Sequence, residues 1–311
     1  MFTAVRGRLA LGAVVVGAAI ALSGCASSDP LASGPSPAPS SSGAKETLIV
    51  GSQGYYSNEI IAELYSQALE AGGFSIDRQY QIGQREVYLP ELEASKIDVF
   101  PEYIGSLLQA LKPDAAGGKP DAVFADLQSV TPEGLTVLPY AAASDQNSWT
   151  VTKAFADKYK LTDIASLKNV TEPITVGGNS ELETRPYGPT ALKDKYSVAI
   201  AGFTPVEDSG GPLTVKALVN NQIQLANIYT ADPNIKSNDL VALEDPDGLF
   251  FPDNITTVVT DKVNEDARGI IEKVNAALSA DDLVGLNAES ANDKMSSQDI
   301  AKKWLSDKGL I

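Results

Sequence analysis

The sequence predicts an α/β fold built as two lobes. Segments with the pattern of buried strands alternate with segments of helical periodicity, which is typical of parallel sheets covered by helices. This alternation runs from residue 47 to 111 and again from 152 to 229, with a less regular stretch between the two runs. About 265 residues follow a low-complexity linker, which is more than one small core needs.

The first run begins with Thr47–Gly51, a short apolar segment that reads as a buried strand. Residues 59–72 follow as an amphipathic helix, because their large apolar side chains recur on one helical face. Gly72 and Gly73 end that helix. The rest of the run predicts strands at residues 74–82 and 97–100 and helices at 87–95 and 103–111.

The second run predicts helices at residues 152–159, 189–196 and 213–220, and strands at 174–177, 199–204 and 224–229. In open parallel sheets, ligands bind at the carboxyl ends of strands. We therefore expect a binding site at the loops that begin at Gly51, Phe100, Gly177 and Tyr229.

The N-terminus has the three parts of a lipoprotein signal peptide. Arg6 and Arg8 supply positive charge, residues 9–22 are apolar, and Cys25 ends a lipobox. The apolar run is shorter than the roughly 20 residues of a spanning helix. We expect residues 1–24 to direct export and Cys25 to carry a lipid. Residues 25–46, rich in Ser, Pro, Ala and Gly, should form a flexible tether. The protein would then be extracytoplasmic and lipid-anchored to the cell membrane.

Composition excludes several functions. The chain has no histidine and one cysteine, which removes Ser-His and Cys-His catalysis, histidine-based zinc sites and an internal disulfide. Its 40 acidic and 24 basic residues give a net charge of −16, which opposes binding to nucleic acid. We expect no metal, no cofactor and no nucleic-acid partner.

Four short segments at predicted strand ends carry candidate chemistry. The polar loop from residue 51 to 59 enters a helix N-terminus, which favours an anionic group but also fits an ordinary capped turn. Tyr103 and Ser106 lie one helical turn apart. Arg185 suits a carboxylate held by two parallel hydrogen bonds, or a solvated surface position. Tyr229 suits either a cation–π contact with a quaternary ammonium or a place in the core.

Together these segments resemble the substrate-binding proteins of glycine betaine, choline and osmoprotectant importers, the ProX and OpuC type. The resemblance rests on several motifs in a fixed order and runs from about residue 48 to 259. The matching motifs are Gly51-Ser52-Gln53, Gly83-Gln84-Arg85-Glu86-Val87, the segment from Ile97 to Ser106, Thr184-Arg185-Pro186, the segment from Asp208 to Thr214, and Tyr229-Thr230-Ala231-Asp232-Pro233.

This resemblance implies a two-lobed periplasmic-binding-protein fold of type II with a hinged ligand cleft. Lobe 1 would hold residues 47–145 and 250–311, and lobe 2 would hold residues 146–249. We expect a monomer whose partners are a small-molecule ligand and the permease of a cognate ABC importer.

The resemblance also assigns site residues. Tyr103 and Tyr229 fall on positions of an aromatic cage for a trimethylammonium group, and Ser106 and Arg185 fall on carboxylate-binding positions. Gln53 stands where many members of the family have lysine.

The match departs from the betaine pattern at two further positions. Asn147 and Asn254 align with cage rings, which leaves two of the four expected rings unless Trp149, Tyr55 or Tyr187 substitutes. Each cation–π contact contributes about 0.5 to 2 kcal/mol. We therefore expect glycine betaine to bind with a dissociation constant above about 10 μM. A polyhydroxy or phenolic ligand remains as compatible as a quaternary amine.

Three functions fit these observations to different degrees. The first is a lipid-anchored protein that captures a small polar solute, of the osmoprotectant or quaternary-amine class by resemblance, and delivers it to an ABC importer. The second is a ligand sensor or scaffold with the same fold. The third is an extracytoplasmic hydrolase that uses a carboxylate pair, but no such pair is marked by spacing. We favour the first and expect no enzymatic activity.

Overall fold

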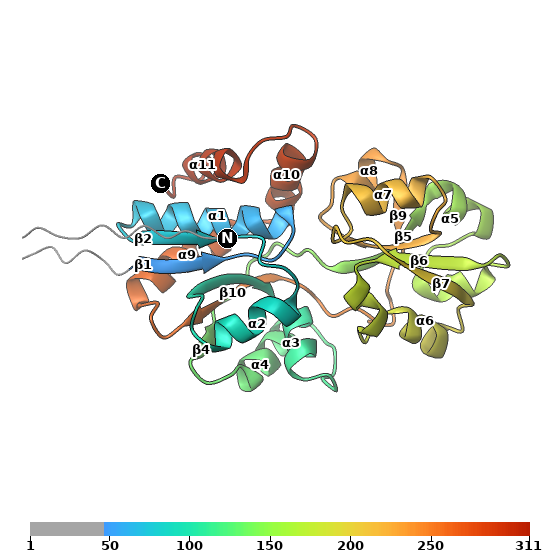
Figure 1. The fold of residues 1–311 in the computed structure, drawn as a ribbon, viewed down its shortest axis with the longest axis horizontal. Helices are drawn as coiled ribbons and strands as arrows, with labels where there is room; N and C mark the ends of the chain where they lie inside the picture. The colour runs from blue at the N-terminus through green and yellow to red at the C-terminus, as the bar shows by residue number, and fades with distance from the viewer. Residues whose placement is uncertain (1–46) are drawn as a thin grey trace, which may run out of the picture. The chain divides into compact units, whose positions relative to one another are not determined.

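The computed structural model describes residues 47–311, which belong to one compact unit. The predicted signal peptide, the lipidation site Cys25 and the tether lie outside the described residues. Two five-stranded sheets with helices on both faces form the described chain (Figure 1), which confirms the predicted two-lobed α/β fold. Within residues 47–311, no helix has both the length and the hydropathy to cross a membrane.

The first sheet has the strand order β2-β1-β3-β10-β4. Its strands are β1 (Thr47–Gly51), β2 (Ser75–Gln79), β3 (Val99–Tyr103), β4 (Leu135–Val137) and β10 (Ile255–Thr260). Figure 1 shows helices above and below this sheet. One face is covered by α1 (Tyr56–Ala71), α9 (Glu265–Ala277), α10 (Ala280–Ala291) and α11 (Ser297–Asp307). The other face is covered by α2 (Arg85–Glu93), α3 (Ile104–Leu111) and α4 (Pro120–Val130).

Strand alternation divides the apolar side chains of this sheet between two cores. Successive residues of a strand point to opposite faces. Val99 and Val259 therefore pack in the core beneath α1, whereas Phe100 and Val258 pack in the clusters on the opposite face. Because both faces are covered, β3 is buried along its whole length.

The second sheet has the strand order β7-β6-β8-β5-β9. Its strands are β5 (Asn147–Thr152), β6 (Ile174–Gly178), β7 (Ile200–Pro205), β8 (Leu225–Tyr229) and β9 (Leu240–Ala242). One face packs against α5 (Lys153–Tyr159), α6 (Pro189–Tyr196) and two 3₁₀ turns, η1 (Ile164–Asn169) and η2 (Ser180–Thr184). The other face packs against α7 (Pro212–Val219) and α8 (Asn234–Ser237).

The predicted strands run parallel within each sheet, but the expectation of wholly parallel sheets is wrong because β10 and β5, two strands that were not predicted, run antiparallel to their neighbours. β1 runs parallel to β2 and β3, and β6 runs parallel to β7 and β8. β10 runs antiparallel to β3 and β4, and β5 runs antiparallel to β8 and β9. Each of these two strands follows a segment that crosses from the other sheet. It therefore starts where the parallel strands end and must run in the opposite direction.

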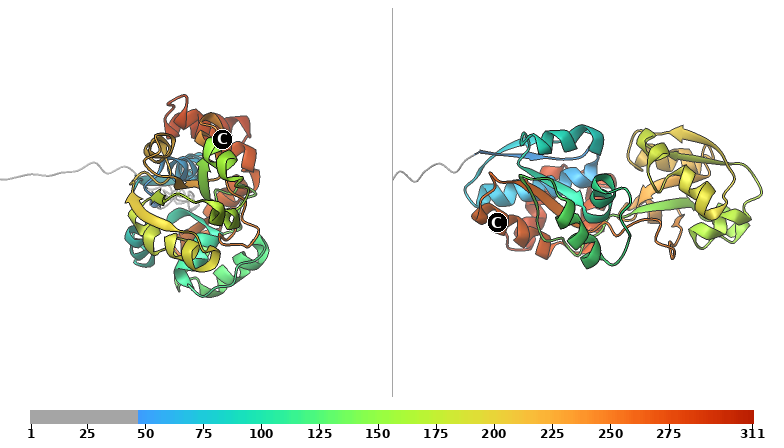
Figure 2. Two further views of the ribbon diagram at one scale, coloured as in Figure 1. Left: turned by 90° about the vertical axis from the view of Figure 1, so that its right-hand side faces the viewer. Right: turned by 90° about the horizontal axis from the view of Figure 1, so that it is seen from below.

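The two crossing segments, residues 138–146 and 243–254, are joined to each other by backbone hydrogen bonds. The Asp145 N–H donates to the Asp253 carbonyl at 3.1 Å, and Ser144 and Asn254 form an antiparallel bridge. Figure 2 shows these two connections between the sheets. Hinges between lobes lie in a few connecting residues, so we expect any hinge of this protein in these two paired segments.

Element bounds differ from the predictions mainly by one to three residues. α1 begins at Tyr56 and not at residue 59, and α3 begins at Ile104 because Tyr103 is the last residue of β3. The elements α4, β4, β5, α8, β9, β10, the two 3₁₀ turns and the three C-terminal helices were not predicted from the sequence.

Candidate functional site

A closed cleft lies where the carboxyl ends of β1, β3, β6 and β8 approach one another. Its lining comes from both sheets and both crossing segments: Gln53, Tyr55, Gln84, Arg85, Tyr103, Ser106, Asp145, Asn147, Asn179, Glu181, Leu182, Arg185, Tyr187, Ser209, Gly210, Asn227, Tyr229 and Asp253. The free space in this cleft is about 40 Å³, which is room for only a few water molecules.

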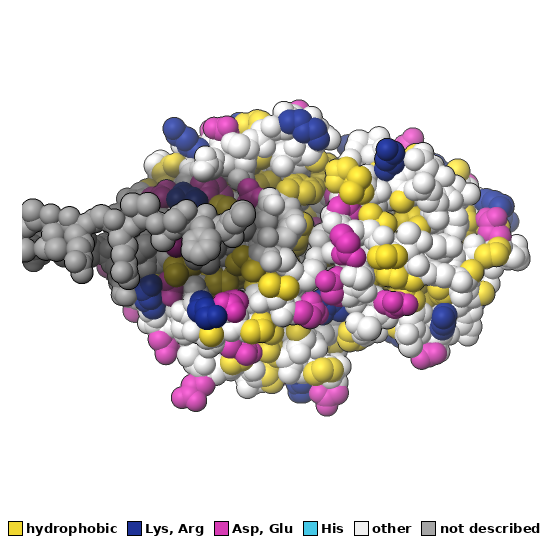
Figure 3. Space-filling model, in the orientation of Figure 1, with side chains coloured by type: hydrophobic (Ala, Val, Ile, Leu, Met, Phe, Trp, Pro, Cys, Tyr) yellow, Lys and Arg dark blue, Asp and Glu magenta, His cyan; other side chains and the backbone are white. Residues whose placement is uncertain are grey.

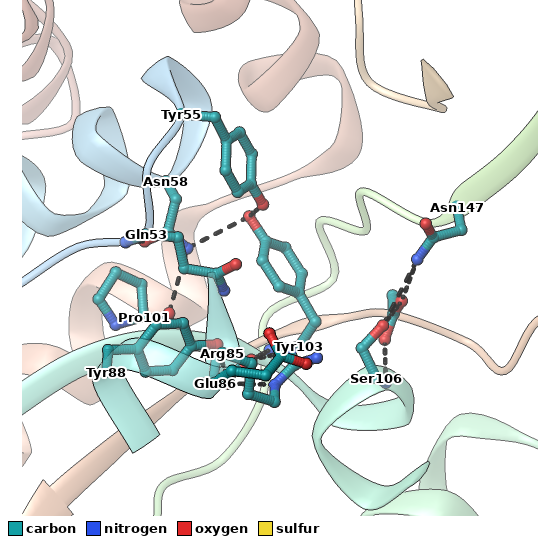
Figure 4. A network of polar contacts seen from close by, with 12 residues as sticks. Gln53, Tyr55, Asn58, Arg85, Glu86, Tyr88, Pro101, Tyr103, Ser106 and Asn147 are labelled. Carbon is teal, nitrogen blue, oxygen red and sulfur yellow. Dashed lines mark hydrogen bonds and ion pairs between the residues drawn. The ribbon is translucent and has the colours of Figure 1, made fainter. Parts of the chain in front are cut away.

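The loop after β1 aims Gln53 into this cleft. The Gln53 N–H donates to Asn58 Oδ1 at 2.8 Å, and Asn58 Nδ2 donates to the Pro101 carbonyl at 3.1 Å. These bonds tie the loop to β3 (Figure 4). Gln53 is 6% exposed, and its Nε2 has no hydrogen-bond acceptor among the described residues. A buried donor without an acceptor is costly, so this amide is suited to a ligand oxygen.

Four tyrosines bring aromatic rings to the cleft from both lobes. Tyr55 donates to the Tyr103 hydroxyl at 2.6 Å, and the Tyr55 and Tyr229 rings stack with centroids 5.2 Å apart. Tyr187 joins the lining from the loop after η2. Burial raises the pKa of Tyr55, Tyr103 and Tyr229 above its ordinary value, so these phenols stay neutral. Tyr55 and Tyr187 thus add two rings to the predicted pair.

Arg85 forms a buried ion pair at the base of the cleft. Its Nη2 lies 2.8 Å from Glu102 Oε2, and its Nε donates to Glu102 Oε1 at 3.0 Å. Glu102 is fully buried in β3 and also accepts from the Tyr88 hydroxyl and the Tyr103 N–H. The charge of Arg85 is therefore matched inside the protein.

Arg185 lies in the cleft lining, but its guanidinium is paired across the lobes. Its Nη1 lies 2.8 Å from Glu86 Oε1, and its Nη2 donates to Glu86 Oε2 at 3.2 Å. Gln84 makes a second cross-lobe contact by donating to the Ser209 hydroxyl at 3.0 Å. Arg185 therefore lines the cleft while its guanidinium is paired with Glu86.

Ser106 and Asn147 meet at Asp253. The Ser106 N–H and hydroxyl both donate to the Asp253 carboxylate at 2.6 Å. Asn147 Nδ2 lies 3.5 Å from both Ser106 Oγ and Asp253 Oδ2. Burial raises the pKa of Asp253 to about 6, against the two hydrogen bonds from Ser106 that lower it. Ser106 is thus already engaged by a carboxylate of the protein.

Asp145 is a second buried acid, on the other crossing segment. It accepts from the Ala231 N–H at 2.9 Å and from the Ser57 hydroxyl at 3.4 Å. Burial raises the pKa of its carboxyl to about 7, and the nearby Asp232 and Asp253 act in the same direction. Neither Asp145 nor Asp253 has a salt-bridge partner among the described residues.

The structure brings together six of the seven predicted ligand-binding residues, namely Gln53, Tyr103, Ser106, Asn147, Arg185 and Tyr229. It does not bring Asn254 into the lining. The Asn254 side chain donates to the Ala141 and Ala142 carbonyls at 3.0 and 3.4 Å. In an extended segment successive side chains point to opposite sides, so its neighbour Asp253 faces the cleft instead. Trp149 is buried in the core of lobe 2 and does not substitute for a ring.

Sequence reasoning missed the two cleft acids and the role of Arg85. Asp145 and Asp253 stand two residues before Asn147 and one residue before Asn254, inside segments that the sequence analysis had already singled out. Asp253 shares its segment with Glu244, Asp245 and Asp247, so the sequence offered no signal that set it apart. Arg85 lies in a matched motif, but its partner Glu102 is only identified by the fold. Among the described residues, no cluster of three or more His, Cys, Asp and Glu suits a metal ion.

Comparisons with known proteins agree with this architecture. The chain is 23% identical over 274 residues to the glycine betaine-binding protein YehZ of Escherichia coli K12, covering 84% of this chain and 90% of that protein. It is 21% identical over 269 residues to the carnitine transport binding protein OpuCC of Listeria monocytogenes, covering 84% of this chain and 86% of that protein.

Solved structures share the fold. A glycine betaine/carnitine/choline ABC transporter structure superposes with a TM-score of 0.68 at 20% identity, covering 85% of this chain and 99% of that chain. Ligand-free YehZ from Escherichia coli superposes with a TM-score of 0.62 at 21% identity, covering 85% and 99%.

The comparison with protein families covers most of the described chain. Residues 46–307 match the OpuAC family, described as the substrate-binding domain of the ABC-type glycine betaine transport system. The match spans both sheets and both crossing segments. The chain therefore belongs to the OpuAC family of substrate-binding domains of ABC-type glycine betaine transport systems.

Proposed function

We propose that this protein is a lipid-anchored, extracytoplasmic binding protein that captures a small polar solute of the osmoprotectant or quaternary-amine class and delivers it to an ABC importer. Family membership gives the coarser part of this function. The chain is a substrate-binding protein and not an enzyme, and its partners are a small-molecule ligand and an ABC permease. The ligand class and the anchor are the proposed part.

The proposed class of ligand is supported mainly by four tyrosine rings, two from each lobe, that line the cleft. Tyr55 and Tyr103 come from lobe 1, and Tyr187 and Tyr229 come from lobe 2. Aromatic faces attract alkylammonium groups, and a site shared by both lobes ties binding to closure. The names of related proteins, which bind glycine betaine, carnitine or ergothioneine, support an amine-bearing solute.

We place lobe 1 at residues 47–145 and 250–311 and lobe 2 at residues 146–249, with the hinge in the paired crossing segments. The cross-lobe contacts of Arg185 with Glu86 and of Gln84 with Ser209 support a closed state held by side chains of both lobes. Opening of the lobes would break these two contacts and expose the cleft. Closing would create a continuous surface across both lobes, and we propose that the permease recognises this surface.

Titration calorimetry tests the ligand class on the full chain purified in detergent. The panel consists of glycine betaine, choline, carnitine and ergothioneine. We expect at least one of them to bind, and we expect Tyr229→Ala and Arg185→Ala each to weaken the tightest binder by at least about tenfold, or about 1.4 kcal/mol. Tyr159→Ala, a lobe 2 tyrosine outside the cleft, is the matched control. Unchanged affinity in both cleft variants would contradict the site.

The proposed anchor rests on the lipobox that ends at Cys25. Thioether lipidation needs the sulfur of that residue, so Cys25→Ser expressed in a native-like host should stay unprocessed or leave the membrane fraction. Ser28→Ala in the adjacent segment is the control and should remain membrane-bound. Membrane retention and processing that do not change in Cys25→Ser would contradict the anchor.

A further inference from the structure

The two lobes also touch at a place outside the cleft lining. The segment that follows β8 turns toward lobe 1, and its Ala231 packs in the core beneath α1. The Ala231 carbonyl accepts from Asn287 Nδ2 of α10 at 3.1 Å. The hydroxyl of Tyr56, the first residue of α1, donates to Asp232 at 3.3 Å. Two helices of lobe 1 therefore hold this segment of lobe 2 by side-chain donors.

This contact leads directly to the cleft. The Asp232 N–H donates to the Tyr229 carbonyl at 3.0 Å, so the chain makes a tight turn after β8. The Tyr229 ring at the start of that turn stacks on Tyr55. The Ala231 N–H donates to Asp145 Oδ1 at 2.9 Å. The position of Ala231 therefore helps to fix both a ring and an acid of the cleft.

Asn287 has a polar atom that lobe 1 does not satisfy. Its side chain is 1% exposed, and its Oδ1 has no hydrogen-bond donor in the described chain. Its helix neighbours Leu283 and Leu286 belong to the same core. An unpaired buried carbonyl destabilises a fold, whereas an apolar side chain at such a position does not. The stability of lobe 1 therefore does not explain an amide here, and the bond to lobe 2 does.

Asn275 of α9 shows the opposite pattern. It is equally buried, but its Oδ1 accepts from the Tyr65 hydroxyl at 2.6 Å. Its Nδ2 donates to the Pro139 carbonyl at 3.0 Å and to Thr257 Oγ1 at 3.3 Å. All three partners belong to lobe 1. Asn275 therefore serves the stability of one lobe, and Asn287 acts between the lobes.

The charge of the chain gives such a contact a purpose. Figure 3 shows acidic side chains on this face where the two lobes meet, and the chain carries a net charge of −16. Like charges on the two lobes oppose closing. The cross-lobe contacts of Gln84 and Glu86 come from the side of α2, and α1 and α10 cover the opposite face of the same sheet. The bond from Asn287 therefore holds the closed state on the other side of lobe 1.

We propose that Asn287 is a positioning residue for closure, which holds the segment after β8 against lobe 1 and so couples α10 to the Tyr229 ring. This inference rests on the hinge described under the proposed function and adds a residue outside the cleft to it. One hydrogen bond contributes enough that its loss should lower the ratio of closed to open molecules by about fivefold. A solute that binds the closed state then loses affinity by up to the same factor.

A distance between the lobes measures this ratio without any ligand. Val87 of α2 and Leu213 of α7 are 54% and 62% exposed, and they flank the contact between Gln84 and Ser209. Spin labels on Val87→Cys and Leu213→Cys therefore separate when the lobes open. The full chain carries Cys25→Ser so that only these two thiols are labelled. Double electron–electron resonance gives the two populations.

Asn287→Leu keeps the number of side-chain heavy atoms and removes both the donor and the unpaired oxygen. It should lower the population with the short distance by about fivefold relative to the long one, while the melting temperature stays within about 2 °C of the wild type. Asn275→Leu is the matched control. It should lower the melting temperature by about 4 °C or more and leave the distances unchanged, because it orphans groups of lobe 1 alone.

Tyr56→Phe is a second test that keeps the packed ring and removes only the donor to Asp232. It should shift the distances in the same direction as Asn287→Leu. Calorimetry with glycine betaine and choline as probes should show that Asn287→Leu weakens each probe that binds the wild type, by up to the same fivefold.

The outcomes separate this inference from the proposed function. Unchanged distances in both Asn287→Leu and Tyr56→Phe would overturn the positioning role and leave solute binding standing. An Asn287→Leu chain that melts as early as Asn275→Leu would show a role in the stability of lobe 1 instead. Failure of the whole amine panel to bind the wild-type chain would count against the proposed ligand class, and the distances in the ligand-free variants would still decide the role of Asn287.

Discussion

Two arginines line the cleft, and their ion pairs differ in burial. The side chain of Arg85 is 11% exposed and its partner Glu102 is fully buried, whereas Glu86, the partner of Arg185, is 54% exposed. Breaking a buried pair leaves an uncompensated charge, but an exposed pair is screened by water. Arg85 therefore supports the lobe, and we expect Arg185 to exchange Glu86 for a ligand group more readily.

We predict that Arg85→Met lowers the free energy of unfolding by about 3 to 5 kcal/mol, because Glu102 loses its cation in the core. Arg185→Met is the paired control and should cost no more than about 1 kcal/mol. Urea denaturation of the ligand-free chain at pH 7.5 measures both. Equal losses in the two variants would show that burial does not distinguish these pairs.

At the scale of elements, the first turn of α3 packs closely against the second crossing segment, residues 243–254. A Cβ added at Gly105 would lie 2.5 Å from Phe251 Cβ and 2.6 Å from the Pro252 carbonyl oxygen. The same turn gives Asp253 its two hydrogen bonds from Ser106. The close approach of α3 to this segment therefore fixes the position of a cleft acid.

We predict that Gly105→Ala destabilises the protein by about 1 to 3 kcal/mol, because the crossing segment must shift to admit the methyl group. It should also weaken ligand binding by displacing Asp253. Gly285→Ala in α10 is the matched control, since a Cβ there meets no atom within 4 Å. That variant should gain about 0.5 to 1 kcal/mol from its better helix propensity. Thermal unfolding measures the stability of both variants, and calorimetry measures their ligand affinity. A Gly105→Ala variant with unchanged stability would contradict the close packing of α3 against the crossing segment.

At the scale of the whole molecule, closure and protonation are linked. Burial raises the pKa of Asp145 to about 7 and that of Asp253 to about 6 in the closed cleft. In an open cleft water reaches both groups, and their pKa values return toward about 4. Protons therefore favour the closed state. The free energy that protonation of Asp145 and Asp253 contributes to closure is complete below about pH 4 and is lost as the pH rises through 6 to 7.

We predict that the ligand-free chain has a smaller radius of gyration at pH 5 than at pH 8, and that a saturating ligand reduces it at pH 8. Small-angle X-ray scattering measures both changes. The double variant Asp145→Asn, Asp253→Asn should lose most of the pH dependence, since neither amide titrates. A wild-type profile that changes with neither pH nor ligand would contradict a closing cleft.

The α/β class, the two runs of elements and six residues of the cleft lining could be predicted from the sequence. Buried strands and amphipathic helices leave local periodic patterns, and Gln53, Tyr103, Ser106, Asn147, Arg185 and Tyr229 fall in motifs at or near strand ends. These features depend on residues close together in the chain, so one sequence is enough to read them.

Which residues face one another across long sequence separations follows from the tertiary fold alone. It paired β10 with β3 and so made each sheet mixed, and it turned Asp253 and not Asn254 toward the cleft. It also neutralised both arginines and left Asp145 and Asp253 without a cation among the described residues. The physical reason is that charge balance and side-chain direction in a cleft depend on partners about 20 to 150 residues apart, and local patterns do not record such pairs.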